Sequence, residues 1–194
     1  MIQRSLILVS FVFLSNLSIG QNKMDWREEY SLRLSDFQST ASQVNDTLKM
    51  HSYAAGTAIE FIYQMSNYEF MFTKNFNSKV RSTFNKNASY ISTPDSTIAK
   101  DLVAFAQYSF DLSELYARNL RKQIFEKKKT LSNARFFRPI YDDIVATLNE
   151  ESTKVFTQFN FGKNKEVLFL AHQKVKEDIL LLSDFCKACK PLKR

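Results

Sequence analysis

Residues 97–129 read TIAKDLVAFAQYSFDLSELYARNLRKQIFEKKK, and they follow the helix-start signal Thr93-Pro94-Asp95-Ser96. Neither Gly nor Pro interrupts the chain between Pro94 and Pro139, and apolar residues recur near the period of an α-helix. The stretch predicts one long helix of roughly 50 Å, whose Lys-rich end should project or fray. The residues expected to face inward are Ile98, Leu102, Phe105, Leu112, Leu115, Leu120 and Ile124.

Two further helices are predicted in the C-terminal part of the chain, where the same periodicity returns. One runs from about Arg135 or Pro139 to Phe159, and the other from about Lys163 to Phe185. Their inward residues are expected to be Ile140, Ile144, Leu148, Val155 and Phe159 in the first helix, and Val167, Leu170, Val175, Ile179 and Leu182 in the second.

The part of the chain before the long helix shows the alternation of β-strands instead. An antiparallel hairpin is predicted around a turn at Ser66-Asn67, followed by one or two more strands. Residues 22–54 show little periodicity and are expected to be irregular, with a short strand near Ser31 to Leu34. Because strands come first and three helices follow, the predicted class is α+β with a small antiparallel sheet. The other expected strands are 57–65, 68–72, 79–84 and 89–91.

The N-terminus has the features of a secretory signal peptide. Arg4 precedes an apolar run from Leu6 to Leu14, and small residues at Ser18 and Gly20 suit cleavage before Gln21. The run is too short to span a bilayer as a helix, although an uncleaved membrane anchor is the alternative. We predict a signal peptide at 1–20, a single domain at 21–185 and a basic tail with a CxxC pair at 186–194. The protein is then exported to the periplasm or outside the cell.

The composition excludes several kinds of function. The chain has 194 residues and a net charge of +7, and 44% of its residues are hydrophobic, as in a globular protein. Its three Gly residues, Gly20, Gly56 and Gly162, cannot form a Gly-rich phosphate-binding loop. Two His and two Cys leave little material for a metal site of ordinary composition.

Cys186 and Cys189 form the CxxC pair near the C-terminus. In an exported protein a disulfide is the favoured state of such a pair. Redox exchange is not favoured, because reactive thiols usually lie at the start of a helix and this pair follows a predicted helix end. We therefore predict a structural disulfide or two thiols without a function.

Several stretches resemble motifs of one bacterial exported protein family. Residues 105–121, FAQYSFDLSELYARNLR, are similar to its motif H-E-Q-x-H-F-D-I-x-E-x-Y-A-R-x-L-R. Residues 32–38, LRLSDFQ, look like L-T-W-x-D-F-x-G, and residues 54–57, AAGT, look like A-A-x-T-x-S-G-I. Residues 158–162, QFNFG, stand where the family has E-T-x-H-G. The family is described as predicted secreted zinc-dependent proteases with a domain of unknown function, and the resemblance implies a zincin-like arrangement.

The residues that would bind zinc in that family are replaced here. In an HExxH helix two imidazoles one turn apart converge on zinc, and the Glu acts as general base. Phe105 and Ser109 stand at the two His, Ala106 at the Glu, Phe161 at the later His and Gln158 at the later Glu. Phenyl and methyl groups have no lone pair for zinc, and one hydroxyl is a poor ligand. The resemblance thus implies a lost site, with no metal, no cofactor and buried aromatic rings in its place.

Three polar residues of the same helix are candidates for a residual binding cleft: Gln107, Asp111 and Glu114. A role in holding the scaffold is the alternative for all three. Glu114 and Arg118, for example, have the spacing and order of a helical ion pair.

A different metal site is a further alternative. His51 and His172 are the only two His residues, and together with Asp36 or Asp111 they would supply three ligands. No spacing in the sequence selects this combination, so these residues are not predicted to bind a metal.

Basic residues outnumber acidic ones by 27 to 20. Such an excess suits anionic surfaces such as lipid headgroups or acidic polysaccharide, and nucleic acid is not expected for an exported chain. A solvated helix face is the alternative explanation. The cations are concentrated at the end of the long helix, in the third helix and in the tail: Arg118, Arg121, Lys122, Lys127, Lys128, Lys129, Lys163, Lys165, Lys174, Lys176, Lys187, Lys190, Lys193 and Arg194.

These observations predict an exported, non-catalytic relative of the zinc-protease-like family, acting as a binding or structural protein of the envelope. One alternative is an active secreted metallopeptidase with atypical ligands. The other is a basic module that binds anionic envelope surfaces. The chain is not expected to be transmembrane after signal cleavage, and its partner is not identified.

Overall fold

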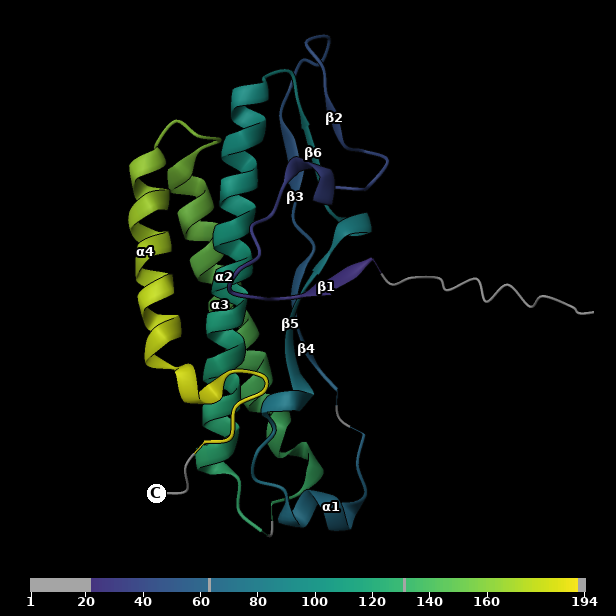
Figure 1. The fold of residues 1–194 in the computed structure, drawn as a ribbon, viewed down its shortest axis with the longest axis vertical. Coiled ribbons are helices and arrows are strands. Elements are labelled where there is room, and N and C mark those ends of the chain that lie inside the picture. Colours follow the sequence, from purple (N-terminus) through teal and green to yellow (C-terminus); the bar gives the residue numbers. More distant parts are fainter. Residues whose placement is uncertain (1–21, 63, 131, 192–194) are drawn as a thin grey trace, which may run out of the picture.

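Strands and long helices form separate layers of the molecule (Figure 1). The computed structural model describes residues 22–62, 64–130 and 132–191, so the predicted signal peptide at 1–20 lies outside the described residues. Two small three-stranded sheets cover one side of a central helix, and two more long helices cover its other side. The predicted α+β class is confirmed. None of the helices in the described part of the chain combines the length and the hydrophobicity needed to span a bilayer.

The first sheet is antiparallel and has the order β1-β5-β4. It is built from β1 (Lys23–Asp25), β5 (Val80–Asn85) and β4 (Thr57–Phe61). Thr57 lies opposite Phe84, and Phe61 opposite Val80. This register turns Val80, Ser82, Phe84 and Ile59 inward, where all four are buried.

The second sheet continues the first. It has the order β2-β6-β3, in which β2 (Gln43–Val44) is parallel and β3 (Ser52–Ala54) antiparallel to β6 (Tyr90–Thr93). Between the sheets the backbones of Gly56 and Asn85 approach closely, and Asn85 N–H donates to Gly56 O at 2.9 Å. A Cβ atom at position 56 would lie 2.8 Å from Asn85 O, so this contact requires glycine.

The prediction of a second hairpin strand at residues 68–72 is wrong. Residues 67–72 form helix α1 (Asn67–Phe72), and β4 pairs instead with β5, the strand expected third. Ser66 caps α1, because its side chain accepts a hydrogen bond from Glu69 N at 3.1 Å. Of the three alternating aromatic residues only Phe70 is buried, whereas Tyr68 and Phe72 are 74% and 64% exposed. The alternation therefore did not reflect a strand with one buried face.

The N-terminal segment also differs from its prediction. Residues 31–34 form no strand, and a 3-10 helix covers Leu34–Asp36. Local hydrogen bonds stabilise this helix, because the Asp36 carboxylate accepts from Arg33 N at 2.8 Å and from the Tyr30 hydroxyl at 2.9 Å. The strands β1, β2 and β3 fall within the segment expected to be irregular. Their partners β5 and β6 are distant in sequence, so no local pattern shows the pairing.

Helix α2 (Ser96–Lys127) is the predicted long helix and lies at the centre of the molecule (Figure 1). Asp95 caps its start, and its carboxylate accepts from Thr97 N at 2.6 Å. The helix contacts strands on one side and α3 (Phe137–Phe159) and α4 (Lys165–Leu181) on the other. Every residue from 108 to 115 is buried as a result, polar ones included.

The Lys-rich end of α2 does not project, contrary to the prediction. Lys128 is only 2% exposed, and its Nζ lies 3.3 Å from Met71 O and 4.4 Å from the centre of the Phe70 ring. Burial lowers the pKa of this ammonium group. The end of α2 is therefore packed against α1.

Helices α3 and α4 are confirmed in type and approximate extent. One inward prediction is wrong, because Leu170 is 59% exposed. Leu168, Val175 and Ile179 supply the buried face of α4, and a residue two positions from Leu168 lies on the opposite side of the helix. Leu170 therefore points to solvent.

Candidate functional site

Three of the positions that align with zinc ligands of the resembled family, Phe105, Ser109 and Phe161, lie in or beside a packed aromatic cluster, whereas the fourth, Gln158, is exposed. The Phe105 side chain is 3% exposed, and Ala106 is fully buried beside it. The rings nearest to Phe105 have centroids 4.9 to 5.8 Å away and belong to Phe156, Phe159, Tyr108 and Tyr53. The burial of this cluster raises the pKa of the Tyr53 hydroxyl above its ordinary value.

Ser109 and Phe161 complete these positions. The Ser109 hydroxyl donates to Phe105 O at 3.0 Å, so its proton is used within the helix. Phe161 follows the C-terminal end of α3 with a left-handed backbone, and its ring lies 5.2 Å from that of Phe156. Phe156 thus contacts both Phe105 and Phe161. Phe105, Ala106, Ser109 and Phe161 together offer one hydroxyl among carbon atoms, which does not fit a zinc ion.

The alternative metal site does not assemble either. His51 Nδ1 lies 2.8 Å from the Thr93 hydroxyl, whereas His172 Nε2 lies 2.6 Å from Asp111 Oδ2. Asp36 binds Lys86 in a third place, at 2.9 Å. Across residues 22–62, 64–130 and 132–191, no three His, Cys, Asp or Glu side chains meet as a metal ion would require.

Asp111 connects three parts of the fold. Its Oδ1 accepts hydrogen bonds from Trp26 Nε1 at 2.7 Å and from Gln107 Nε2 at 3.0 Å, and its Oδ2 contacts His172. Gln107 in turn accepts from Leu32 N at 2.8 Å. Two of the three predicted cleft residues, Gln107 and Asp111, are therefore brought together.

The third predicted cleft residue, Glu114, belongs to a separate buried network. Its Oε1 lies 3.0 Å from Arg118 Nε and 2.8 Å from Arg121 Nη1. Arg118 is 6% exposed and Arg121 is fully buried, so neither adds to a basic surface, in contrast to the prediction. The expected Glu114–Arg118 pair is present, but it holds the interior together instead of lining a cleft.

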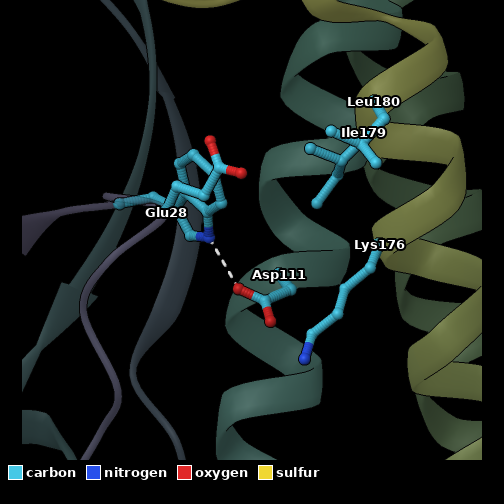
Figure 2. A pocket seen from close by; sticks show the side chains of 6 residues that line it. Glu28, Asp111, Lys176, Ile179 and Leu180 are labelled. Atoms are coloured by element: carbon cyan, nitrogen blue, oxygen red, sulfur yellow. Dashed lines mark hydrogen bonds between the residues drawn. The ribbon is translucent and has the colours of Figure 1, made fainter.

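A pocket of about 310 Å³ opens beside Asp111 (Figure 2). Figure 2 shows Glu28 on the N-terminal segment and Lys176 on α4, on either side of Asp111. Neither the Glu28 side chain nor the Lys176 side chain makes a hydrogen bond or an ion pair with any residue that the structure describes. The apolar part of the lining comes from the side chains of Trp26, Ile179 and Leu180.

The Trp26 ring is held rigidly at the edge of this pocket. Its N–H donates to Asp111, and the Arg118 guanidinium lies 5.5 Å from the ring centre in a cation–π contact. The pocket therefore combines a fixed aromatic face, an aliphatic wall and two opposite charges that no described residue pairs. Its size is near the lower end for sites that enclose small molecules.

Cys186 and Cys189 form a disulfide just beyond α4. The Cys189 carbonyl accepts hydrogen bonds from Asn75 Nδ2 at 3.1 Å and from Asn77 Nδ2 at 3.0 Å. The disulfide loop is thereby tied to the segment that leads into β5.

Sequence reasoning missed Trp26, Glu28 and Lys176 as members of a site. Trp26 stands out as the only Trp of the chain, but no motif connects it to Asp111, 85 positions away. Glu28 and Lys176 are surface charges of an ordinary kind, and only the packing of α4 beside the N-terminal segment brings them to one pocket.

The chain matches no protein-family model, no curated protein and no solved structure. The resemblance to the zinc-protease-like family therefore rests on the quoted sequence motifs alone.

Proposed function

We propose that this protein is an exported, non-catalytic relative of the zinc-protease-like family, with a binding or structural role in the cell envelope. One observation carries the proposal: the positions of the family's zinc ligands and general base hold Phe105, Ala106, Ser109 and Phe161, and three of these side chains are buried among aromatic rings. Phenyl and methyl groups with a single Ser hydroxyl supply neither a set of zinc ligands nor a general base for hydrolysis.

The binding role is assigned to the pocket beside Asp111. Its free carboxylate at Glu28 and free ammonium at Lys176 suit a ligand with a positive and a negative end, and Trp26 suits an apolar or planar group between them. A short peptide with free termini has this chemistry.

Zinc titration by calorimetry tests the loss of catalysis. We expect no stoichiometric binding, and no chelator-sensitive cleavage of an unfolded protein substrate. Tight 1:1 binding that disappears in Ser109→Ala would overturn the proposal by restoring a site at the family position. Zinc binding that disappears in His172→Ala but persists in Ser109→Ala, together with chelator-sensitive cleavage, would instead support the metallopeptidase with atypical ligands.

The fluorescence of Trp26 tests the pocket, because it is the only Trp of the chain. Di- and tripeptides with free termini should change its emission, and Lys176→Ala should remove the response. The matched control is Lys174→Ala, which changes an exposed lysine two positions away that pairs with Asp178. No response to any such peptide, or an equal loss in both variants, would refute the assignment.

A further inference from the structure

We propose that the end of the molecule formed by α1 and the C-terminal end of α2 binds the surface of an anionic lipid bilayer. We call this region the α1 tip and define it as residues 62, 64–79, 122–130 and 132–137. Figure 1 shows α1 at the lower extremity of the molecule, next to the end of α2. The α1 tip shares no residue with the pocket beside Asp111, so a negative result for one proposal leaves the other unaffected.

The α1 tip exposes large apolar side chains that no described element covers. Tyr68 and Phe72 are 74% and 64% exposed, and their rings lie side by side with centroids 4.8 Å apart. Ile62 and Met71 add further apolar surface, at 43% and 38% exposed. Only Phe70 of the α1 side chains is buried, where it packs against Phe76 and Phe137. A short helix thus presents its aromatic face outward, which is costly in water.

The same region contains most of the net charge of the chain. It holds seven of the 27 Lys and Arg residues but only two of the 20 Asp and Glu residues, in a chain of net charge +7. None of the seven pairs with a carboxylate in the part of the chain that the structure describes. The seven are Lys74, Lys79, Lys122, Lys127, Lys128, Lys129 and Arg135, and the two acids are Glu69 and Glu126.

The buried Lys128 fixes this surface in place. Its ammonium group binds Met71 O and the face of the Phe70 ring, and so joins α1 to the end of α2. The exposed lysines on either side of it, Lys127 and Lys129, therefore lie at the same end of the molecule as the exposed aromatic side chains of α1. Lys128 itself is not available to an anionic partner.

A bilayer surface offers both of the environments that the α1 tip needs. Anionic headgroups attract the lysines, and the apolar region just beneath them accepts Tyr68, Met71 and Phe72. Aromatic side chains with nearby cations are typical of the boundary between headgroups and hydrocarbon. An acidic polysaccharide would match the charges but would leave the apolar side chains in water.

Vesicle co-sedimentation tests the proposal with two probes, phosphatidylcholine vesicles and vesicles in which phosphatidylglycerol replaces part of the phosphatidylcholine. The protein should bind the anionic vesicles only, and less tightly as salt is added. Lys74→Gln/Lys127→Gln/Lys129→Gln should weaken binding about a hundredfold, because each lysine near an anionic surface usually strengthens binding by about fivefold. Tyr68→Ser/Phe72→Ser should weaken it by about tenfold or more.

Two control variants separate the α1 tip from general properties of the chain. Lys100→Gln/Lys154→Gln/Lys163→Gln removes the same charge from exposed lysines elsewhere, and Phe169→Ser/Leu170→Ser removes two exposed apolar side chains of α4. Both should bind as the wild type does, and all four variants change exposed residues, so circular dichroism should show unchanged folding. Equal losses in tip and control variants, absence of vesicle binding, or equal binding to neutral vesicles would overturn the proposal. Binding to heparin that is insensitive to Tyr68→Ser/Phe72→Ser, without vesicle binding, would replace the lipid by an acidic polymer.

Discussion

Glu114 Oε1 and Arg121 Nη1 lie 2.8 Å apart, two helical turns from each other on α2, and the Arg121 side chain is fully buried. Arg121 also donates hydrogen bonds to Val80 O at 2.9 Å and to Phe185 O at 2.9 Å. A single guanidinium therefore joins the sheet, the central helix and the segment after α4.

Replacing Arg121 by Met should destabilise the protein strongly. The change leaves the Glu114 carboxylate with only one of its two cations and removes the donor to the Val80 carbonyl, which is buried, and to the Phe185 carbonyl, which is half-buried; we expect a loss of about 3–5 kcal/mol. Urea unfolding followed by circular dichroism measures it. The control Arg138→Met removes an exposed pair with Asp142 and should cost under about 0.5 kcal/mol. Similar losses in both variants would contradict the role given to the buried network.

Asp111→Ala should loosen the contact between the N-terminal segment, α2 and α4. Trp26 Nε1, Gln107 Nε2 and His172 Nε2 all lose their partner, and we expect a loss of about 2–3 kcal/mol. The emission of Trp26 should shift to the red as its indole gains access to water. Asp178→Ala, which removes a surface pair with Lys174, is the control and should leave both quantities nearly unchanged. An unshifted emission would show that Asp111 does not hold Trp26.

The aromatic cluster around Phe105 should behave as a hydrophobic core. Phe105→Ala should cost about 3–5 kcal/mol, because it opens a cavity among four rings. Ser109→Ala, by contrast, removes only a hydroxyl bonded within its own helix and should cost under about 1 kcal/mol. Phe169→Ala, on the exposed face of α4, is the control for loss of a phenyl group. A large loss in Ser109→Ala with a small one in Phe105→Ala would argue for a polar site instead.

Stability should fall as the solution is acidified, in part through Asp36. Burial acts to raise the pKa of this carboxyl group, but hydrogen bonds from Lys86, Arg33 N and Tyr30 outweigh it and hold the pKa below its ordinary value of 3.8. The unfolded chain then takes up the proton first, so the contribution of Asp36 is present above that value and is lost as the pH falls through the lower, folded value. Unfolding free energies measured from about pH 6 to about pH 3 should show a shallower decline for Asp36→Asn than for the wild type. A steeper decline in the variant would contradict this sign.

The helices could be predicted because their evidence is local. The start of α2 follows from Asp95 as a capping residue, and the extents of α2, α3 and α4 follow from apolar spacing uninterrupted by Gly or by Pro past the first turn. The absence of zinc-ligand chemistry at Phe105, Ala106, Ser109 and Phe161 is also visible without a structure, because it concerns the chemistry of these side chains.

The strands could be predicted only in part. The strands predicted over residues 57–65 and 79–84 contain most of β4 and β5, but the first prediction ran four residues too far, and the sequence did not show that β4 and β5 pair with each other. Short apolar runs such as residues 68–72 fit a strand or a helix equally well. The Ser66 cap and the burial of Phe70 against Phe137 decide for the helix.

The class of the fold, the three long helices and the carbon-rich character of the turn from Phe105 to Ser109 could be read from residue types and from spacings within one element. The burial of Arg121 and Lys128, the separation of Glu114 from Asp111, and the convergence of Trp26 and His172 on Asp111 emerge only from the packed molecule. Trp26 and His172 reach Asp111 across 85 and 61 positions of the chain. Contacts over such separations depend on how the elements pack against one another, and they produce no periodic pattern in the sequence.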